Sequence, residues 1–140
     1  MTISVQFIGP TLALIAWTMV MWLWMYAVRL PALNASGLKP DDARNTKALD
    51  EILPPKSQWP AHNYNHLHEA PTLFYAVAIV LAIIGAGDGF NTQLAWAYVG
   101  LRVAHSIVQA TNNRVIVRFA LFALSSLVLM ALGDALIGGL

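Results

Sequence analysis

The sequence predicts an all-α integral membrane four-helix bundle, and three observations support this prediction. Of the 140 residues, 58% are hydrophobic and only 11% are charged, with a mean hydropathy of +0.60. These values exceed what a soluble domain of this size carries. The first apolar run, from Phe7 to Val28, has no charged residue. As a helix it would be about 33 Å long, enough to cross a hydrocarbon core of about 30 Å.

Residues 1–140 are predicted to form a single transmembrane domain with several apolar spans. The expected spans are about 7–30, 66–86, 93–112 and 115–137. The first is interpreted as a retained span and not a signal peptide, because it is too long and no basic segment precedes it. Gly85, Gly87 and Asp88 predict a tight turn after the second span, while Asn112 and Asn113 separate the third from the fourth.

Residues 31–65 are predicted to form a solvated cytoplasmic loop. Five of the seven prolines lie between Leu30 and Pro60, together with a balanced set of acidic and basic residues. Within this loop, acidic residues stand at the start of a segment whose apolar residues have the spacing of an amphipathic helix. That pattern predicts a short surface helix from about Asp41 to Leu53.

The lysines and arginines predict how the spans are oriented, because cytoplasmic flanks retain basic residues. Seven of the eight lie in the first or the third connection: Arg29, Lys39, Arg44, Lys47, Lys56, Arg114 and Arg118. The turn around Asp88 has none, so both termini are expected outside the cytoplasm. The eighth, Arg102, lies inside the third apolar run, where a charge costs several kcal/mol unless it is paired or hydrated. Arg102 therefore needs a partner.

Composition also excludes some kinds of chemistry. The chain has no cysteine, so it offers neither a disulfide nor a thiolate metal site. Any nucleophilic thiol must come from a substrate or a cofactor. The formal net charge is only +1, which argues against a nucleic-acid partner.

Two polar stripes on neighbouring spans predict a buried site. On one helical face at the start of the second span lie His62, Asn65, His66 and Glu69. The third span carries a similar stripe: Arg102, His105 and Gln109. We expect the stripes to face each other, with Glu69 pairing with Arg102. Pro71 cannot donate a backbone hydrogen bond, so it frees the carbonyl of Leu67 and is expected to kink the helix beside this cluster.

Other interpretations of these residues stay open. Histidines four apart on a helix can share an ion, so His62, His66, His68 and Glu69 could form a metal site. Four histidines in all are too few for a histidine-rich di-iron hydroxylase, and no metal ligand is assigned. A structural ion pair between Glu69 and Arg102 would lock the bundle without catalysis. Cations near a span end, such as Arg118, can also snorkel toward lipid headgroups.

Four motifs carry a resemblance to a known family. The segment "LRVAHSIVQATNNRVIVRF" places His105 three residues and Arg118 sixteen residues after Arg102, and "NYNHLHEAPTLFY" opens the second span. Arg29 lies near the cytoplasmic end of the first span. With these motifs in order over nearly the whole chain, the protein resembles a bacterial-type MAPEG protein, one of the membrane-associated proteins in eicosanoid and glutathione metabolism.

The resemblance implies a homotrimer in a bacterial inner membrane, with glutathione bound between subunits near the cytoplasmic face. It implies a transferase or peroxidase in which Arg118 is catalytic and stabilises the thiolate that attacks a lipophilic electrophile. The implied glutathione-binding residues are Arg29, Asn65, His66, Glu69, Arg102, His105 and Gln109. Glutathione carries two carboxylates and an ammonium group, so a site for it needs both cations and a carboxylate.

The sequence also departs from the family pattern. Asn65 precedes Glu69 by four residues instead of three, and Gln109 replaces a tyrosine found in several catalytic members. The chain has no arginine between Arg44 and Arg102, where the enzymes keep one. A non-catalytic membrane protein of the same fold, with a structural or interaction role, is therefore the alternative.

Overall fold

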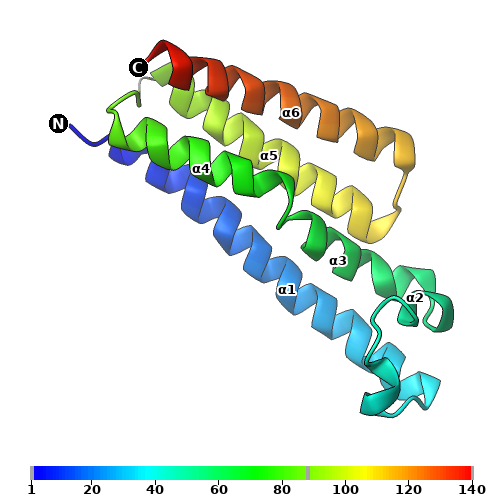
Figure 1. The fold of residues 1–140 in the computed structure, drawn as a ribbon. Helices are drawn as coiled ribbons and strands as arrows, with labels where there is room; N and C mark the ends of the chain where they lie inside the picture. The colour runs from blue at the N-terminus through cyan, green and yellow to red at the C-terminus, as the bar shows by residue number, and fades with distance from the viewer. Residues whose placement is uncertain (1, 88, 140) are drawn as a thin grey trace.

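The computed structural model describes residues 2–87 and 89–139, and every regular element in these residues is a helix (Figure 1). The chain is all-α, as predicted. In order, the elements are η1 (Val5–Phe7), α1 (Ile8–Ser36), η2 (Pro40–Ala43), α2 (Leu49–Ile52), α3 (Pro55–His66), α4 (Ala70–Ile83), α5 (Gly89–Thr111) and α6 (Val115–Gly138). Asp88, expected in a turn, lies outside the described residues.

Three helical segments of the described chain are long and apolar enough to cross a membrane: Val5–Ser36, Pro55–Ile83 and Val115–Gly138. Their large side chains often point outward. Ile116 and Ile137 of α6 are 83% and 75% exposed, which suits lipid and not water. Helix α5 carries more polar side chains and is not among these segments. That α5 crosses the membrane, and that the protein has four spans in all, therefore stays a prediction.

The segment expected as a loop, 31–65, contains more helix than predicted. Helix α1 continues through Pro31 and ends only before Gly37, whose φ of +69° is the left-handed conformation that stops helices. Helix α3 begins at Pro55, where the fixed φ of proline suits the first helical turn. The expected surface helix exists only as the short pieces η2 and α2.

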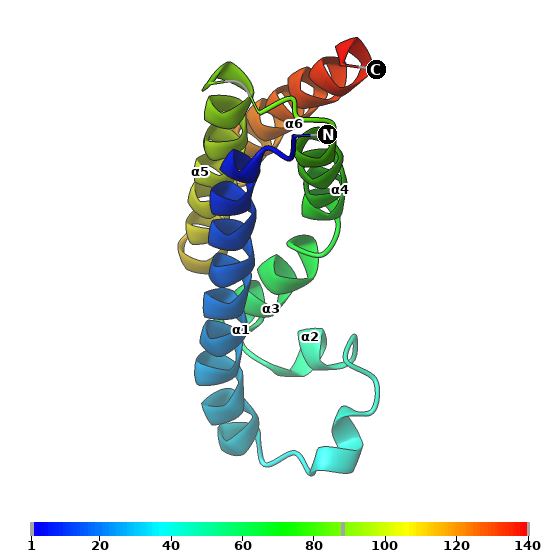
Figure 2. The ribbon, with the colours of Figure 1, turned by 90° about the vertical axis from the view of Figure 1, so that its left-hand side faces the viewer.

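The second long helix is broken beside Pro71, as the sequence predicts. Helix α3 ends at His66 and α4 begins at Ala70, with Glu69 at φ −97° and ψ −93° between them. Pro71 occupies the first turn of α4, where its missing N–H costs no helical hydrogen bond. The break changes the neighbours of this segment. Helix α3 packs against α1 and α5, while α4 packs against α6 and η1 (Figures 1 and 2).

Side chains from all the long helices form one apolar core. Its buried members include Leu14 and Met21 of α1, Phe74 and Leu81 of α4, Ala95 and Val99 of α5, and Leu132 of α6. Phe74 also stacks on Tyr98 of α5, with ring centroids 4.5 Å apart and planes 8° apart. This stack fixes α4 against α5 close to the broken segment.

A short turn joins α5 to α6, which run antiparallel (Figure 1). Asn113 closes it with φ +52°, a left-handed conformation that asparagine tolerates better than most residues. Its N–H donates to the carbonyl of Val108 at 2.7 Å. The turn brings the start of α6 beside the end of α5.

Gly85 should resist substitution, because it follows the end of α4 with φ +74° and an added Cβ would lie 2.6 Å from the Thr2 carbonyl oxygen. We expect Gly85→Ala to lower the free energy of unfolding by at least about 1 kcal/mol. Unfolding in detergent micelles with increasing dodecyl sulfate, followed by tryptophan fluorescence, measures this. Gly100→Ala is the control, since its Cβ meets open space inside α5 and should stabilise by about 0.5–1 kcal/mol. Equal effects of the two changes would contradict the prediction.

Candidate functional site

A buried guanidinium lies at the centre of the polar residues. Arg102 of α5 has 0% exposure. Its Nη2 donates a hydrogen bond to Nδ1 of His66 over 2.6 Å. His66 is the last residue of α3, so the break that follows places its ring at the junction of α3 and α5. The partner that Arg102 requires is therefore an imidazole.

Ring stacking holds the His66 imidazole in place. The His105 ring of α5 lies parallel to it, with centroids 4.9 Å apart and planes 17° apart. The Phe122 ring of α6 packs at 5.7 Å. Three helices thus contribute to the environment of one side chain, which fixes its orientation.

These rings form walls of a pocket of ≈ 230 Å³ between α3, α5 and α6. Its lining residues are His66, His105, Val115, Arg118, Phe119 and Phe122. Arg118 is the cation in this lining, and the remaining walls are imidazole, aromatic or aliphatic. We call it the Arg118 pocket. It combines one fixed positive charge with a largely apolar surface.

Asn113 positions Arg118. The Nη1 of Arg118 donates to the side-chain oxygen of Asn113, while its Nε is buried and has no hydrogen-bond partner in the described chain. From the sequence, Asn113 was predicted only to separate two helices. An asparagine just after a helix end and five residues before an arginine was the signal that it missed.

A second polar pocket, of ≈ 280 Å³, lies where the first connection meets α1 and α3. Its polar and charged lining includes Arg29, Lys47, Asp50, Gln58, His62 and Asn65. Nε2 of Gln58 donates to the Leu49 carbonyl at 2.6 Å and holds α2 against α3. We call it the Arg29 pocket. Five of the eight predicted site residues are therefore divided between two pockets. The other three lie outside both linings: Arg102 and Gln109 are buried, and Glu69 is exposed.

Comparison with known proteins decides the family. The model of the MAPEG family matches residues 7–137, nearly the whole chain. The chain belongs to the MAPEG family. Together with the apolar helices, this membership makes it an integral membrane protein and points to glutathione or eicosanoid metabolism. No curated protein and no solved structure gave a match.

The predicted hydrogen-bonded pair of Glu69 with Arg102 is wrong for this MAPEG chain. Arg102 bonds His66, and the ion pairs found in the described residues join Arg44 to Asp41 and His62 to Asp50. Glu69 is exposed. The reason is the helix break, because the non-helical backbone at Glu69 takes it out of the face it would share with His66 on a continuous helix.

The alternative metal site is also wrong, since no three histidine or acidic side chains of the described residues gather closely enough to hold an ion. Each histidine of the proposed cluster has another partner. His62 bonds the Asp50 carboxylate at 3.1 Å, and Nδ1 of His68 bonds the Tyr64 carbonyl at 2.8 Å. His66 accepts from Arg102. The four-residue spacing alone did not reveal these partners.

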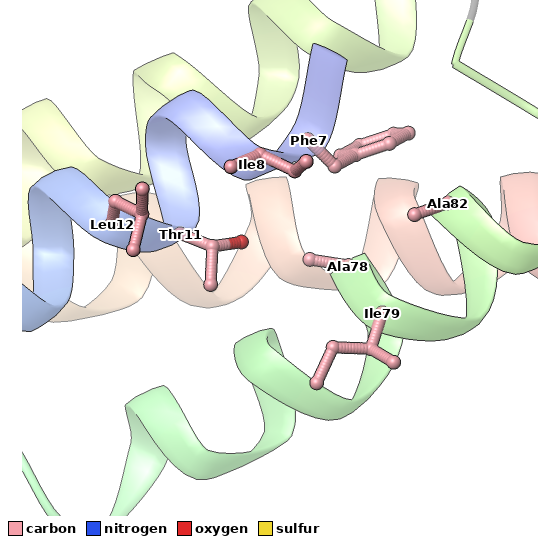
Figure 3. A pocket seen from close by; sticks show the side chains of 7 residues that line it. All are labelled: Phe7, Ile8, Thr11, Leu12, Ala78, Ile79 and Ala82. Carbon is pink, nitrogen blue, oxygen red and sulfur yellow. The ribbon is translucent and has the colours of Figure 1, made fainter. Parts of the chain in front are cut away.

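Two apolar hollows between α1 and α4 were not expected from the sequence. One, of ≈ 130 Å³, is lined by Phe7, Ile8, Thr11 and Leu12 on one side and by Ala78, Ile79 and Ala82 on the other (Figure 3). The other, of ≈ 210 Å³, includes Ile15, Met19 and Tyr75. Both follow one face of α1, and their chemistry suits a hydrocarbon chain.

Proposed function

We propose that this MAPEG protein is a glutathione-dependent transferase or peroxidase that acts on a lipophilic electrophile. The observation that carries the proposal is Arg118, a cation fixed by Asn113 in a pocket with imidazole and aromatic walls. Such a pocket offers a positive charge beside largely apolar walls. An anion therefore gains more from the charge there than it would in water.

Arg118 would stabilise the thiolate of glutathione. A guanidinium stays protonated at neutral pH, whereas a free thiol, with a pKa of about 8.5, is mostly protonated. Next to Arg118 the thiolate form is favoured and becomes the nucleophile. Its sulfur then forms a bond to an electrophilic carbon, whose leaving group departs with the bonding electrons. With a lipid hydroperoxide, the sulfur attacks an oxygen and breaks the O–O bond; the alkoxide takes a proton to become the alcohol, and a second glutathione converts the sulfenic acid to the disulfide and water.

The Arg29 pocket supplies groups for the peptide part of glutathione. Arg29 and Lys47 suit its two carboxylates, and Asn65 can hydrogen-bond its amides. Glu69 is exposed and could receive the ammonium group. We propose that the protein is a homotrimer and that a neighbouring subunit completes the site, because Asn65 and Glu69 both face outward in the single chain.

The membrane would deliver the second substrate. Apolar hollows along α1 and α4 and the apolar outer face of α6 are compatible with lipophilic molecules that enter from the bilayer. We propose a bacterial inner membrane as the location, with both termini outside the cytoplasm, because the basic residues gather in the first and third connections.

Titration with glutathione tests the proposal. We expect purified protein to bind glutathione and to develop the ultraviolet absorbance of a thiolate at neutral pH, because Arg118 favours that form. S-methylglutathione is the control ligand, since it should compete for binding without producing the absorbance. Absence of binding at millimolar glutathione would contradict the proposed function.

One observation favours a second candidate, a non-catalytic membrane protein of the same fold. The buried Arg102–His66 bond ties α3 to α5 and gives an intramembrane cation a hydrogen-bond acceptor without any ligand. A protein with this role would bind no thiol and would copurify with another membrane protein. The same titration, followed by analysis of the copurifying proteins, separates the two candidates.

A further inference from the structure

Arg102 lies behind the Arg118 pocket and not in it. The side chain is fully buried, and it does not belong to the residues that line the pocket. His66 lies between the two, bonded to Arg102 through Nδ1 and exposed to the pocket as part of its wall. The hydrogen bond of Arg102 therefore reaches the pocket through the His66 imidazole.

The direction of this hydrogen bond determines the protonation of His66. A guanidinium has only donors. Nδ1 of His66 must therefore accept and carries no proton, so the neutral ring has its hydrogen on Nε2. The His105 ring stacked on one face and the tilted Phe122 ring hold the plane of the imidazole, and a flipped ring would lose its hydrogen bond to Arg102. His66 then has a single N–H donor.

We propose that Arg102 is a positioning residue that holds His66 as a neutral Nε2–H donor, and that this N–H hydrogen-bonds the anion stabilised by Arg118. The inference rests on the proposed function for the identity of that anion, the thiolate sulfur. His66 touches the reacting sulfur and is a catalytic residue in this scheme, whereas Arg102 acts only through His66.

The arrangement assigns different tasks to the two side chains of the pocket. Arg118 supplies a full charge, and His66 supplies a directed hydrogen bond. The positive charge of Arg102 polarises the ring and strengthens its N–H as a donor. Because Nε2 keeps its proton and Nδ1 is occupied, His66 cannot serve as a general base. A neutral imidazole that donates is an established way to stabilise a developing anion.

Nitrogen NMR tests the protonation of His66 without any ligand. The full chain, labelled with ¹⁵N-histidine and placed in lipid bilayers, has four imidazoles, and the His66→Gln spectrum identifies the His66 signals by difference. We expect a protonated Nε2 and an unprotonated Nδ1. In Arg102→Lys, which keeps a donor, this form should persist, and in Arg102→Met it should become a mixture of tautomers. A protonated Nδ1 in the wild type would overturn the proposal, even if the Arg102 variants fail to fold.

Thiolate absorbance tests the donor role. His66→Leu removes the N–H and should reduce the thiolate fraction of bound glutathione at neutral pH about tenfold, as expected for one lost hydrogen bond to a charged group. His66→Gln, whose amide can donate from a similar position, should recover most of it. An unchanged fraction in His66→Leu would overturn the donor role. If the wild type binds no thiol, the proposed function and the donor role both fail, and the NMR spectrum still decides whether Arg102 sets the tautomer.

Discussion

Arg118→Ala should lower the turnover of glutathione with a lipophilic electrophile by about a hundredfold at neutral pH, the usual cost of removing one group that stabilises an anion. Without the guanidinium, the bound thiol loses the positive charge that favours its ionisation, and only the hydrogen bond proposed for His66 remains. Turnover of the variant should therefore rise as the pH approaches about 8.5, the ordinary pKa of a thiol, whereas the wild type should change little over this range. Initial rates measured across pH at saturating glutathione check both expectations.

Arg114→Ala is the matched control for this experiment. Arg114 is an exposed cation at the same end of α6, and it is not part of the Arg118 pocket lining. Its removal changes the net charge equally but should leave turnover within about twofold, because an exposed charge is screened by water and salt. If Arg118→Ala keeps full turnover, or if both variants lose it equally, Arg118 is not the thiolate stabiliser.

Phe74→Ala should reduce the free energy of unfolding by about 3 kcal/mol or more, the range for removing a large buried aromatic side chain. Phe74 has 0% exposure and stacks on Tyr98. The substitution leaves a cavity between α4 and α5 and also removes the ring contact. Unfolding in mixed micelles with increasing dodecyl sulfate measures the loss.

Leu73→Ala is the matched control, because it lies next in sequence on the same helix but is 62% exposed. Truncating it should change the free energy of unfolding by less than about 0.5 kcal/mol, as for other exposed positions. Similar losses from both substitutions would show that Phe74 is not a special packing contact.

Much of the fold could be predicted because its signals are local. The long apolar runs predicted the helices, and the family resemblance was confirmed by a match over residues 7–137. Pro71 predicted the break in the second long helix, since proline restricts its own backbone whatever surrounds it. The helix through Pro31 was missed, because an isolated proline inside a long apolar helix can be tolerated when the rest of the helix is well supported.

The candidate site was predicted less well, because it depends on how separate helices meet. The sequence indicated that Arg102 must be paired, and Glu69 was the obvious carboxylate. The break at residues 67–69 removes Glu69 from the helical face and leaves His66 as the nearest partner. Phe122 could not be assigned to the site, since only the packing of α6 against its neighbours brings it to His66. Asn113 was missed although it lies only five residues before Arg118.

The sequence by itself determined the environment of this protein, its helical class and its family, because hydrophobicity and motif spacing are properties of the chain alone. Only the tertiary structure decided that an imidazole and not a carboxylate receives the buried guanidinium, and that five of the eight predicted site residues divide between two pockets. The physical reason is that a hydrogen bond requires two groups within about 3 Å. Which groups come that close depends on the break, the register and the packing of helices far apart in sequence.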